Sequence, residues 1–305
     1  MDTEIQKDTH THDDITGKYD EIPTIALIYD FDGTLSPSNM QEYEFLRAIG
    51  IDDSRQFWNE NDAMMKLHDA TNVLCCMRLM IEKSRAAHIP ITRSTFRSYG
   101  AGVELYKGVK EWFGYINRFG KRLGVQLHHY INSSGLKEMI EGTPIAKEFR
   151  EIYACTFMYD ENGVAVWPAV AVDFTAKTQF LFMINKGVSR VSDSHLINEY
   201  LPESERPQPF NRMIYFGDGF TDVPCMKLVK QYGGKSIAIY NRNVPYEQRQ
   251  MLRNLVTGQR VDFACEGDYR ADGELSGVVQ TIIRKMKADY DFDQLAKQNR
   301  APYSS

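Results

Sequence analysis

The sequence predicts an α/β protein with a doubly wound, mostly parallel sheet that carries a helical domain as an insertion. Three observations support this prediction. Short apolar segments of strand length alternate with helical stretches along most of the 305-residue chain, which is the pattern of βαβ units. One long segment after the first strand has helical spacing throughout. Polar clusters follow several strands, at the edge where open α/β sheets bind their ligands.

The first predicted strand runs into an acidic loop. In IALIYDFDGTLSPS, residues 25–38, five apolar or aromatic residues precede Asp30 and Asp32, as is typical of a central parallel strand. Two carboxylates at the end of a buried strand are costly unless a cation or hydrogen-bond donors neutralise them. A plain acidic turn, with Gly33 at a positive φ and Thr34 as a cap, is the alternative at this point.

Further strands are predicted along the rest of the chain, one of them with two histidines. His128 and His129 would face opposite sides of their strand, and we expect structural roles for both. A hairpin is indicated by Asn162-Gly163 between alternating apolar residues. The predicted segments are 126–132 (QLHHYIN), the hairpin 155–172, 213–217 (MIYFG), 236–241 (SIAIYN) and 261–267 (VDFACEG).

The segment after the first strand has no clear strand pattern and is predicted to be an inserted helical domain. Its apolar residues recur at helical spacing, for example at Val73, Met77 and Met80. We interpret this Met-rich stripe as core rather than as a ligand-binding surface. The predicted division of the chain is a disordered polar tail (1–20), an α/β core (21–42 and 122–290), a helical cap (43–121) and a C-terminal tail (291–305).

Composition excludes several functional classes. Apolar residues make up 43% and charged residues 25% of the chain, which is ordinary for a globular protein. The net charge of −5 offers no basic field for nucleic acid or an anionic membrane, and no apolar run could span a bilayer. The five cysteines include the adjacent Cys75 and Cys76, which suit neither a disulfide nor a CxxC metal site. Buried free thiols, and hence the cytoplasm, are expected.

Four polar clusters together provide what phosphoryl transfer requires. A carboxylate can act as nucleophile, and a second carboxyl two residues on can serve as general acid and base. A hydroxyl and an ammonium can orient phosphoryl oxygens, and a third carboxylate can complete a Mg²⁺ site. In chain order the clusters are Asp30-Phe-Asp32-Gly33-Thr34, Ser133-Ser134-Gly135, Lys177 at the start of the helix AKTQFLFMIN, and Asp218-Gly219-Phe-Thr-Asp222.

Through DFDGTL, INSSG, DFTAKT and GDGFTD, the sequence resembles the haloacid dehalogenase-like (HAD) hydrolase superfamily over residues 24–285. The resemblance implies a Rossmann-like core with a helical cap of the C1 type. It also implies that Asp30 is a phosphorylated nucleophile and Asp32 the general acid and base. Mg²⁺ would be held by Asp30, the backbone carbonyl of Asp32 and Asp218.

The same resemblance assigns the remaining motif residues, two of which have rivals. Ser133 would contact the phosphate, although Ser134 is an alternative. Lys177 would stabilise the nucleophile and the phosphate; Lys186 is its competitor, but Lys186 ends the predicted helix, where a cation meets the helix dipole favourably. Asp222 would orient the site.

Within the superfamily, the second aspartate indicates phosphate-ester chemistry, because dehalogenases lack it. The order of segments is most similar to the phosphoserine phosphatase branch, but Asn39 stands where that branch has a glutamate, and the insertion 187–212 is longer. We therefore expect a Mg²⁺-dependent phosphatase acting on a small phosphorylated metabolite. The alternatives are a phosphotransferase or mutase using the same aspartyl phosphate, and a non-catalytic phospho-accepting or binding module.

Overall fold

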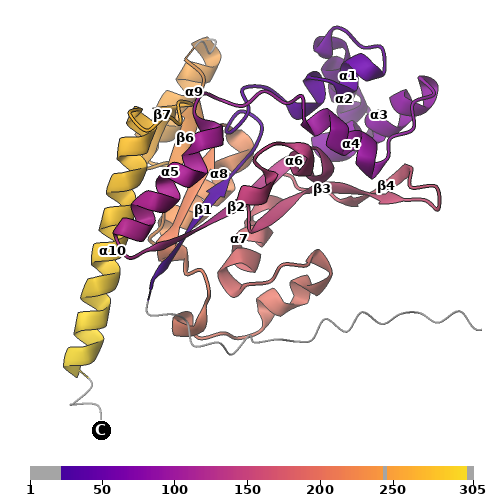
Figure 1. The fold of residues 1–305 in the computed structure, drawn as a ribbon. Coiled ribbons are helices and arrows are strands. Elements are labelled where there is room, and N and C mark those ends of the chain that lie inside the picture. The colour runs from indigo at the N-terminus through magenta and orange to yellow at the C-terminus, as the bar shows by residue number, and fades with distance from the viewer. Residues whose placement is uncertain (1–21, 243–245, 301–305) are drawn as a thin grey trace, which may run out of the picture.

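A computed structural model describes residues 22–242 and 246–300 (Figure 1), so the predicted tail 1–20 lies outside the described residues. Within them the centre is a seven-stranded sheet in the order β4-β3-β2-β1-β5-β6-β7. Neighbouring strands are parallel except for the antiparallel pair β3 and β4. The predicted doubly wound, mostly parallel sheet is confirmed. Its strands are β1 (Thr24–Tyr29), β2 (Gln126–Leu136), β3 (Glu151–Tyr159), β4 (Ala165–Val170), β5 (Met213–Gly217), β6 (Lys235–Tyr240) and β7 (Phe263–Glu266).

The direction in which the chain adds strands reverses beside β1. From β1 the chain moves outward through β2 to the β3–β4 hairpin, and it then returns to place β5, β6 and β7 on the other side of β1. The carboxyl ends of β1, β2 and β5 are consequently neighbours at a topological switch point. Such a point is where open α/β sheets form their ligand-binding crevice.

Helices cover both faces of the sheet (Figure 1). On one face lie α5 (Val109–Arg122) and α10 (Glu274–Arg300), and Tyr29 of β1 accepts a 2.9 Å hydrogen bond there from the indole of Trp112. Side chains alternate along a strand, so Asp30, the next residue, points to the opposite face, toward α7 (Ala176–Lys186). The fourth helix of these layers, α8 (Val223–Gln231), packs beside α7 and against β5 and β6.

The helical insertion is shorter than the predicted segment 43–121. Its last helix, α5, packs on the sheet because its buried stripe, which includes Trp112, Phe113 and Ile116, faces the core. The helices that stand together above the strand ends in Figure 1 are α1 (Phe45–Ala48), α2 (Ser54–His68), α3 (Asn72–Ala86) and α4 (Arg93–Gly100).

The helix α4 is anchored on the α/β core through α6 (Lys137–Gly142). A Cβ atom at Gly142 would lie only 1.9 Å from the backbone oxygen of Arg97, so the close approach of the two helices requires glycine there. The buried carboxylate of Glu138 accepts hydrogen bonds from Thr156 and Tyr159 of β3, the latter at 2.7 Å, and pairs with Arg93 of α4 at 3.2 Å.

Two other predictions differ from the structure at the ends of elements. The strand predicted at 126–132 continues to Leu136, with a register shift against β3 after Asn132. The predicted C-terminal tail begins too early, because α10 continues to Arg300; no Gly or Pro interrupts 278–300, and Lys285–Asp289 and Lys287–Asp291 pairs support this part. The insertion 187–212 forms short 3₁₀ turns.

Structural roles are observed for the paired histidines, and the prediction of buried free thiols is confirmed. His129 lies between the hydroxyl of Tyr29 (3.1 Å) and Asn117 Oδ1 (3.0 Å), and His128 contacts Gln208. All five cysteines are buried and unpaired. In the part of the chain that the structure describes, no helix combines the length and apolar character needed to cross a membrane.

The remaining helical elements, which connect the layers, are α9 (Tyr246–Thr257), η1 (Met40–Glu42), η2 (Ala146–Glu148), η3 (Val191–Asn198), η4 (Glu203–Glu205), η5 (Phe210–Arg212) and η6 (Phe220–Asp222).

Candidate active site

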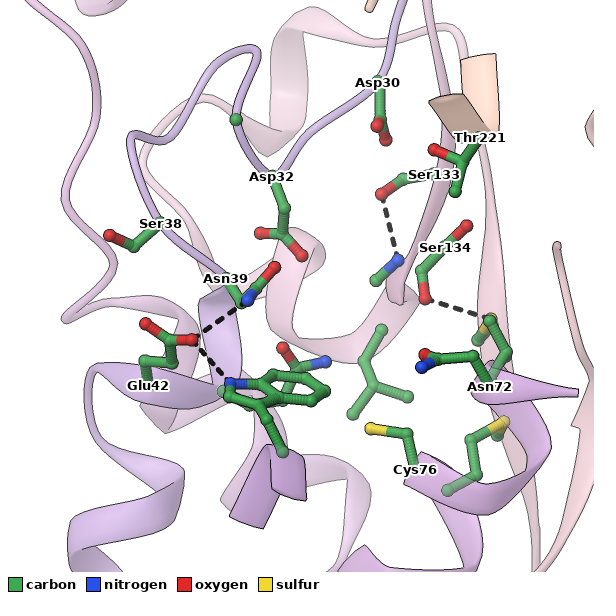
Figure 2. A pocket seen from close by; sticks show the side chains of 18 of the residues that line it. Asp30, Asp32, Ser38, Asn39, Glu42, Asn72, Cys76, Ser133, Ser134 and Thr221 are labelled. Atoms are coloured by element: carbon green, nitrogen blue, oxygen red, sulfur yellow. Dashed lines mark hydrogen bonds between the residues drawn. The ribbon is translucent and has the colours of Figure 1, made fainter. Parts of the chain in front are cut away.

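The predicted site residues meet at the switch point, beneath the helices α1–α4. Asp30 directly follows β1, Asp218 directly follows β5, Ser133 lies in β2, and Lys177 lies in the first turn of α7. A cavity of about 530 Å³ opens here (Figure 2). The motif residues on its wall are Asp30, Asp32, Gly33, Ser133, Ser134, Gly135 and Asp218.

Lys177 is the buried cation of the site. Its ammonium lies 3.0 Å from Asp30 Oδ2 and 2.7 Å from Asp222 Oδ1, and its side chain is fully buried. Burial alone would lower the pKa of Lys177, but the charges of Asp222 and Asp30 outweigh this and raise it. Lys177 therefore carries its charge at neutral pH. Its competitor Lys186 donates instead to the backbone oxygen of Glu199.

Hydrogen-bond donors occupy both oxygens of the Asp222 carboxylate, with two donors on each. Its Oδ1 accepts from Lys177 and, at 2.7 Å, from the hydroxyl of Tyr215. Its Oδ2 accepts from the backbone amides of Asp218 (3.2 Å) and Gly219 (3.4 Å). A carboxylate has about four acceptor positions, so Asp222 is placed to hold Lys177 and the loop after β5 rather than to bind a further ligand.

Asp30 and Asp218 are left as the carboxylates with capacity for a metal. Ligand atoms of Asp30, Asp218 and Asp222 all lie within 4.8 Å of one another, and Lys177 supplies only one positive charge. Burial, followed by the charge of Asp222, raises the pKa of Asp30 to about 6 and that of Asp218 well above its ordinary value. This excess of buried negative charge and oxygen donors fits a hard divalent cation.

Asp32 has a different environment from Asp30. It lies on the cavity wall, where Oδ1 accepts a 2.9 Å hydrogen bond from the backbone amide of Met40. Burial, followed by the charge of Asp30, raises the pKa of Asp32 well above its ordinary value. Such a carboxyl can hold a proton and give it to a bound group.

The glycine that follows Asp32 is required by its surroundings. Gly33 has φ +74°, and a Cβ there would lie 2.1 Å from Asp218 Oδ2, so a side chain would displace the neighbouring carboxylate. The positive φ of the plain-turn alternative is thus observed. The capping role of Thr34 is not, because its buried hydroxyl has no hydrogen-bond partner among the described residues. Its backbone oxygen accepts instead from Tyr269.

Both serines of the second cluster reach the cavity. Ser133 is fully buried, accepts a 3.0 Å hydrogen bond from the amide of Gly135, and lies next to Asp30 in Figure 2. The hydroxyl of Ser134 has no partner in the described ranges. Both serines thus line the cavity, with Ser133 next to Asp30.

The comparisons with known proteins agree with this arrangement. A family model of haloacid dehalogenase-like hydrolases matches residues 27–227, well over half of the chain. The chain belongs to the HAD hydrolases. A relative from Borreliella burgdorferi, described as an uncharacterized protein, is 29% identical over 273 residues, covering 80% of this chain and 91% of the relative.

Solved structures show the same fold at low sequence identity. A HAD family hydrolase from Salmonella enterica serovar Typhi is 16% identical with a TM-score of 0.53, over 87% of this chain and 73% of that one. A substrate-bound phosphoserine phosphatase is 12% identical with a TM-score of 0.51, over 86% and 100% of the two chains. A probable phosphoserine phosphatase from Vibrio cholerae has the same two values, over 89% of this chain and 67% of that one. The similarity to the phosphoserine phosphatase branch is thus confirmed at the level of fold.

The outer part of the cavity in this HAD hydrolase comes from residues that no motif indicated. Glu42 Oε1 accepts hydrogen bonds from Trp58 Nε1 (2.6 Å) and Asn39 Nδ2 (2.9 Å) on one side (Figure 2). The predicted Met-rich stripe is buried, as expected for core residues, but Val73, Met77 and Met80 also line the cavity. The stripe is therefore both core and cavity wall. The lining residues outside the motifs include Asn72, Val73, Cys76, Met77, Met80 and Leu136.

Proposed function

We propose that the protein is a Mg²⁺-dependent phosphatase that hydrolyses a small phosphomonoester through a phosphorylated Asp30. One observation carries the proposal: the carboxylate of Asp30 and that of Asp32 face the same cavity but have different neighbours. Asp30 contacts a charged lysine, whereas Asp32 is placed to hold a proton. Pairs of carboxyls whose pKa values are separated in this way suit nucleophile and acid roles.

The first step forms an acyl phosphate. An oxygen of Asp30 attacks phosphorus, the bond from phosphorus to the ester oxygen breaks, and Asp32 gives its proton to the departing alkoxide. In the second step Asp32 takes a proton from water, the water oxygen attacks phosphorus, and phosphate leaves as Asp30 is regenerated. The hydroxyl of Ser133 stabilises the phosphoryl oxygens, and Lys177 stabilises the charge of Asp30 beside them.

Mg²⁺ would be held by Asp30, Asp218 and the backbone carbonyl of Asp32, where it would neutralise charge on the phosphoryl group. The surplus of carboxylates over cations around Lys177 supports this assignment. Asp222 acts as a positioning residue through its four hydrogen bonds.

The helices α1–α4 act as a cap over the site in this proposal. Together with η1 they supply the outer cavity wall, from Glu42 of η1 and Trp58 of α2 on one side to Met77 of α3 on the other, and so exclude water and select the substrate. With α5 assigned to the core layer, the cap comprises residues 40–100. A cavity of about 530 Å³ suits a small phosphorylated metabolite.

The test is phosphate release from p-nitrophenyl phosphate and from a panel of phosphorylated metabolites, with and without EDTA. We expect release with Mg²⁺ and none with EDTA. Phosphate transfer to an added alcohol without release to water would identify the phosphotransferase alternative. No turnover of any compound with Mg²⁺ would contradict the proposed function.

A further inference from the structure

The charge on the cavity wall limits what the substrate can carry besides its phosphate. Lys177 contacts Asp30 but does not line the cavity, and among the described lining residues there is no Lys, Arg or His. A second anionic group on the substrate, such as a carboxylate or another phosphate, would therefore be desolvated without a cationic partner, which is costly. The charged residues that line the cavity are Asp30, Asp32, Glu42 and Asp218.

Glu42 is the one charged residue of this wall that belongs to the cap side, and it is fixed in place. Its Oε1 accepts from the indole of Trp58 at 2.6 Å and from the amide of Asn39 at 2.9 Å. No hydrogen bond within the described residues engages Oε2, so one oxygen remains for a ligand. The indole that donates its N–H to a carboxylate becomes more electron-rich, which strengthens its attraction for a cation.

Gln41, the residue before Glu42, offers a second hydrogen-bond acceptor. Gln41 lines the same cavity and is only 5% exposed, and its Oε1 has no hydrogen-bond partner in the described part of the chain. A buried acceptor without a donor costs free energy. A ligand that brings N–H donors would satisfy it, whereas a ligand that brings only acceptors would not.

We propose that the leaving group of the substrate carries an ammonium group, bound by Glu42, the ring of Trp58 and the amide oxygen of Gln41. The substrate class is the phosphate ester of an amino alcohol that has no carboxylate. The apolar wall of Val73, Met77 and Met80 packs against its carbon chain. This inference rests on the proposed function and specifies the substrate of that site.

The experiment compares ethanolamine phosphate with two esters of similar size. n-Propyl phosphate has an uncharged alkyl group, and phosphoglycolate carries a carboxylate in place of the ammonium group. kcat and KM are measured for the native protein, for Glu42→Gln, and for Glu44→Gln as a matched control, because Glu44 is exposed and does not line the cavity. p-Nitrophenyl phosphate is run beside them as a substrate without an ammonium group.

We expect kcat/KM for ethanolamine phosphate to exceed that for n-propyl phosphate by about tenfold or more, and phosphoglycolate to be the poorest, because a charge-assisted contact has this size. Glu42→Gln should raise KM for ethanolamine phosphate about tenfold, a much larger change than in KM for n-propyl phosphate or p-nitrophenyl phosphate. Glu44→Gln should behave as native.

Equal turnover of the three esters, or an equal effect of Glu42→Gln on all of them, would overturn the ammonium assignment while leaving the phosphatase proposal intact. Absence of turnover of all four esters with Mg²⁺ would count against the phosphatase proposal instead. In that case calorimetry with ethanolamine phosphate decides the inference. Binding to the Asp30→Asn protein that is lost in the double variant with Glu42→Gln supports it. No binding to Asp30→Asn, or equal binding to the double variant, overturns it.

Discussion

Asp30 and Asp32 are separated by a single residue but have different neighbours. Asp30 contacts the ammonium of Lys177 at 3.0 Å, which offsets part of its burial and of the charge of Asp222, and its pKa is raised only to about 6. Asp32 has a backbone amide as its hydrogen-bond donor and a pKa raised well above the ordinary value by burial and by Asp30. At neutral pH we therefore expect Asp30 to be ionised, whereas Asp32 can hold a proton.

Replacing Asp32 by Asn removes the proton donor while keeping the size of the side chain. We expect kcat for an alkyl phosphate to fall by about 10²- to 10⁴-fold. The loss in the rate of phosphoenzyme formation should be smaller for p-nitrophenyl phosphate, because its leaving group needs no proton. Burst kinetics with both substrates check this, and unchanged rates for the alkyl phosphate would remove Asp32 from acid–base work.

At this scale the sequence predicts the residues at strand ends and misses those on the cap. Asp30, Ser133 and Asp218 are placed by a simple rule, because the carboxyl ends of parallel neighbours share one edge. Glu42 and Trp58 meet only because η1 and α2 approach each other, and helical spacing within one segment does not determine the partner of a side chain on another.

At the scale of elements, the contact between α4 and α6 fixes the inserted helices to the α/β core. Glu138 of α6 has a side chain that is 1% exposed and joins Arg93 of α4 to Thr156 and Tyr159 of β3. Because the serine cluster at the end of β2 leads directly into α6, this contact also positions the wall of the cavity.

Glu138→Ala removes a buried carboxylate and leaves three donors without their acceptor. We expect a loss of about 3 kcal/mol in the free energy of unfolding, measured by urea denaturation. Glu141→Ala is the matched control on the same helix, since its pair with Arg97 is more exposed and should cost less than about 1 kcal/mol. Similar losses for the two variants would show that Glu138 does not anchor α4.

Two element boundaries show what local sequence cannot determine. The stripe on α5 looks like that of any amphipathic helix, and only the tertiary structure shows that it faces β1 and β2 rather than the cap. The C-terminal part of α10 is polar and exposed, so it has no apolar periodicity, although the two lysine–aspartate pairs at four-residue spacing were a readable signal for helix.

At the scale of the whole molecule, the central strand joins the site to an aromatic core on the opposite face. The ring centroid of Tyr29 lies 6.0 Å from that of Phe113 and 4.5 Å from that of Phe216. Its hydroxyl hydrogen-bonds to both Trp112 and His129. His129 is 3% exposed, and burial, with the charge of His128, lowers its pKa to about 3. The folded protein therefore keeps this imidazole neutral.

The buried His129 makes stability depend on pH. Between the folded pKa of about 3 and the unfolded value of about 6.5, the unfolded chain binds a proton that the native state does not. The free energy of unfolding therefore falls as pH falls through this window, by up to about 1.4 kcal/mol per pH unit for one site. His129→Gln should reduce the slope of the free energy of unfolding between pH 4 and pH 6, which both lie inside this window, by up to this amount.

The measurement for His129 is chemical denaturation at several pH values. His68→Gln is the control, because His68 is exposed and its replacement should leave the slope unchanged. The buried aspartates, whose pKa values are raised, contribute to the pH dependence in the opposite direction. Their contribution is the same in every variant and cancels when the slopes are compared. An identical slope in native protein and His129→Gln would contradict the buried, neutral histidine.

The doubly wound topology was predictable because it follows from the alternation of strand-like and helical segments. The site at the switch point then follows from topology, since β1 has to be flanked by β2 and β5. The shape of the cavity between cap and core was not predictable, because it depends on how two separately folded layers face each other.

The most direct test of the central claim is to detect phosphate on Asp30 itself. The native protein and Asp30→Asn would be mixed with Mg²⁺ and p-nitrophenyl phosphate, quenched in acid within the first turnover, and analysed by peptide mass spectrometry. We predict one phosphoryl group on Asp30 in the native protein, and no phosphorylation and no turnover in the variant, which should fold normally. Turnover by Asp30→Asn, or native turnover with phosphate on another residue, would contradict the assignment of Asp30 as nucleophile.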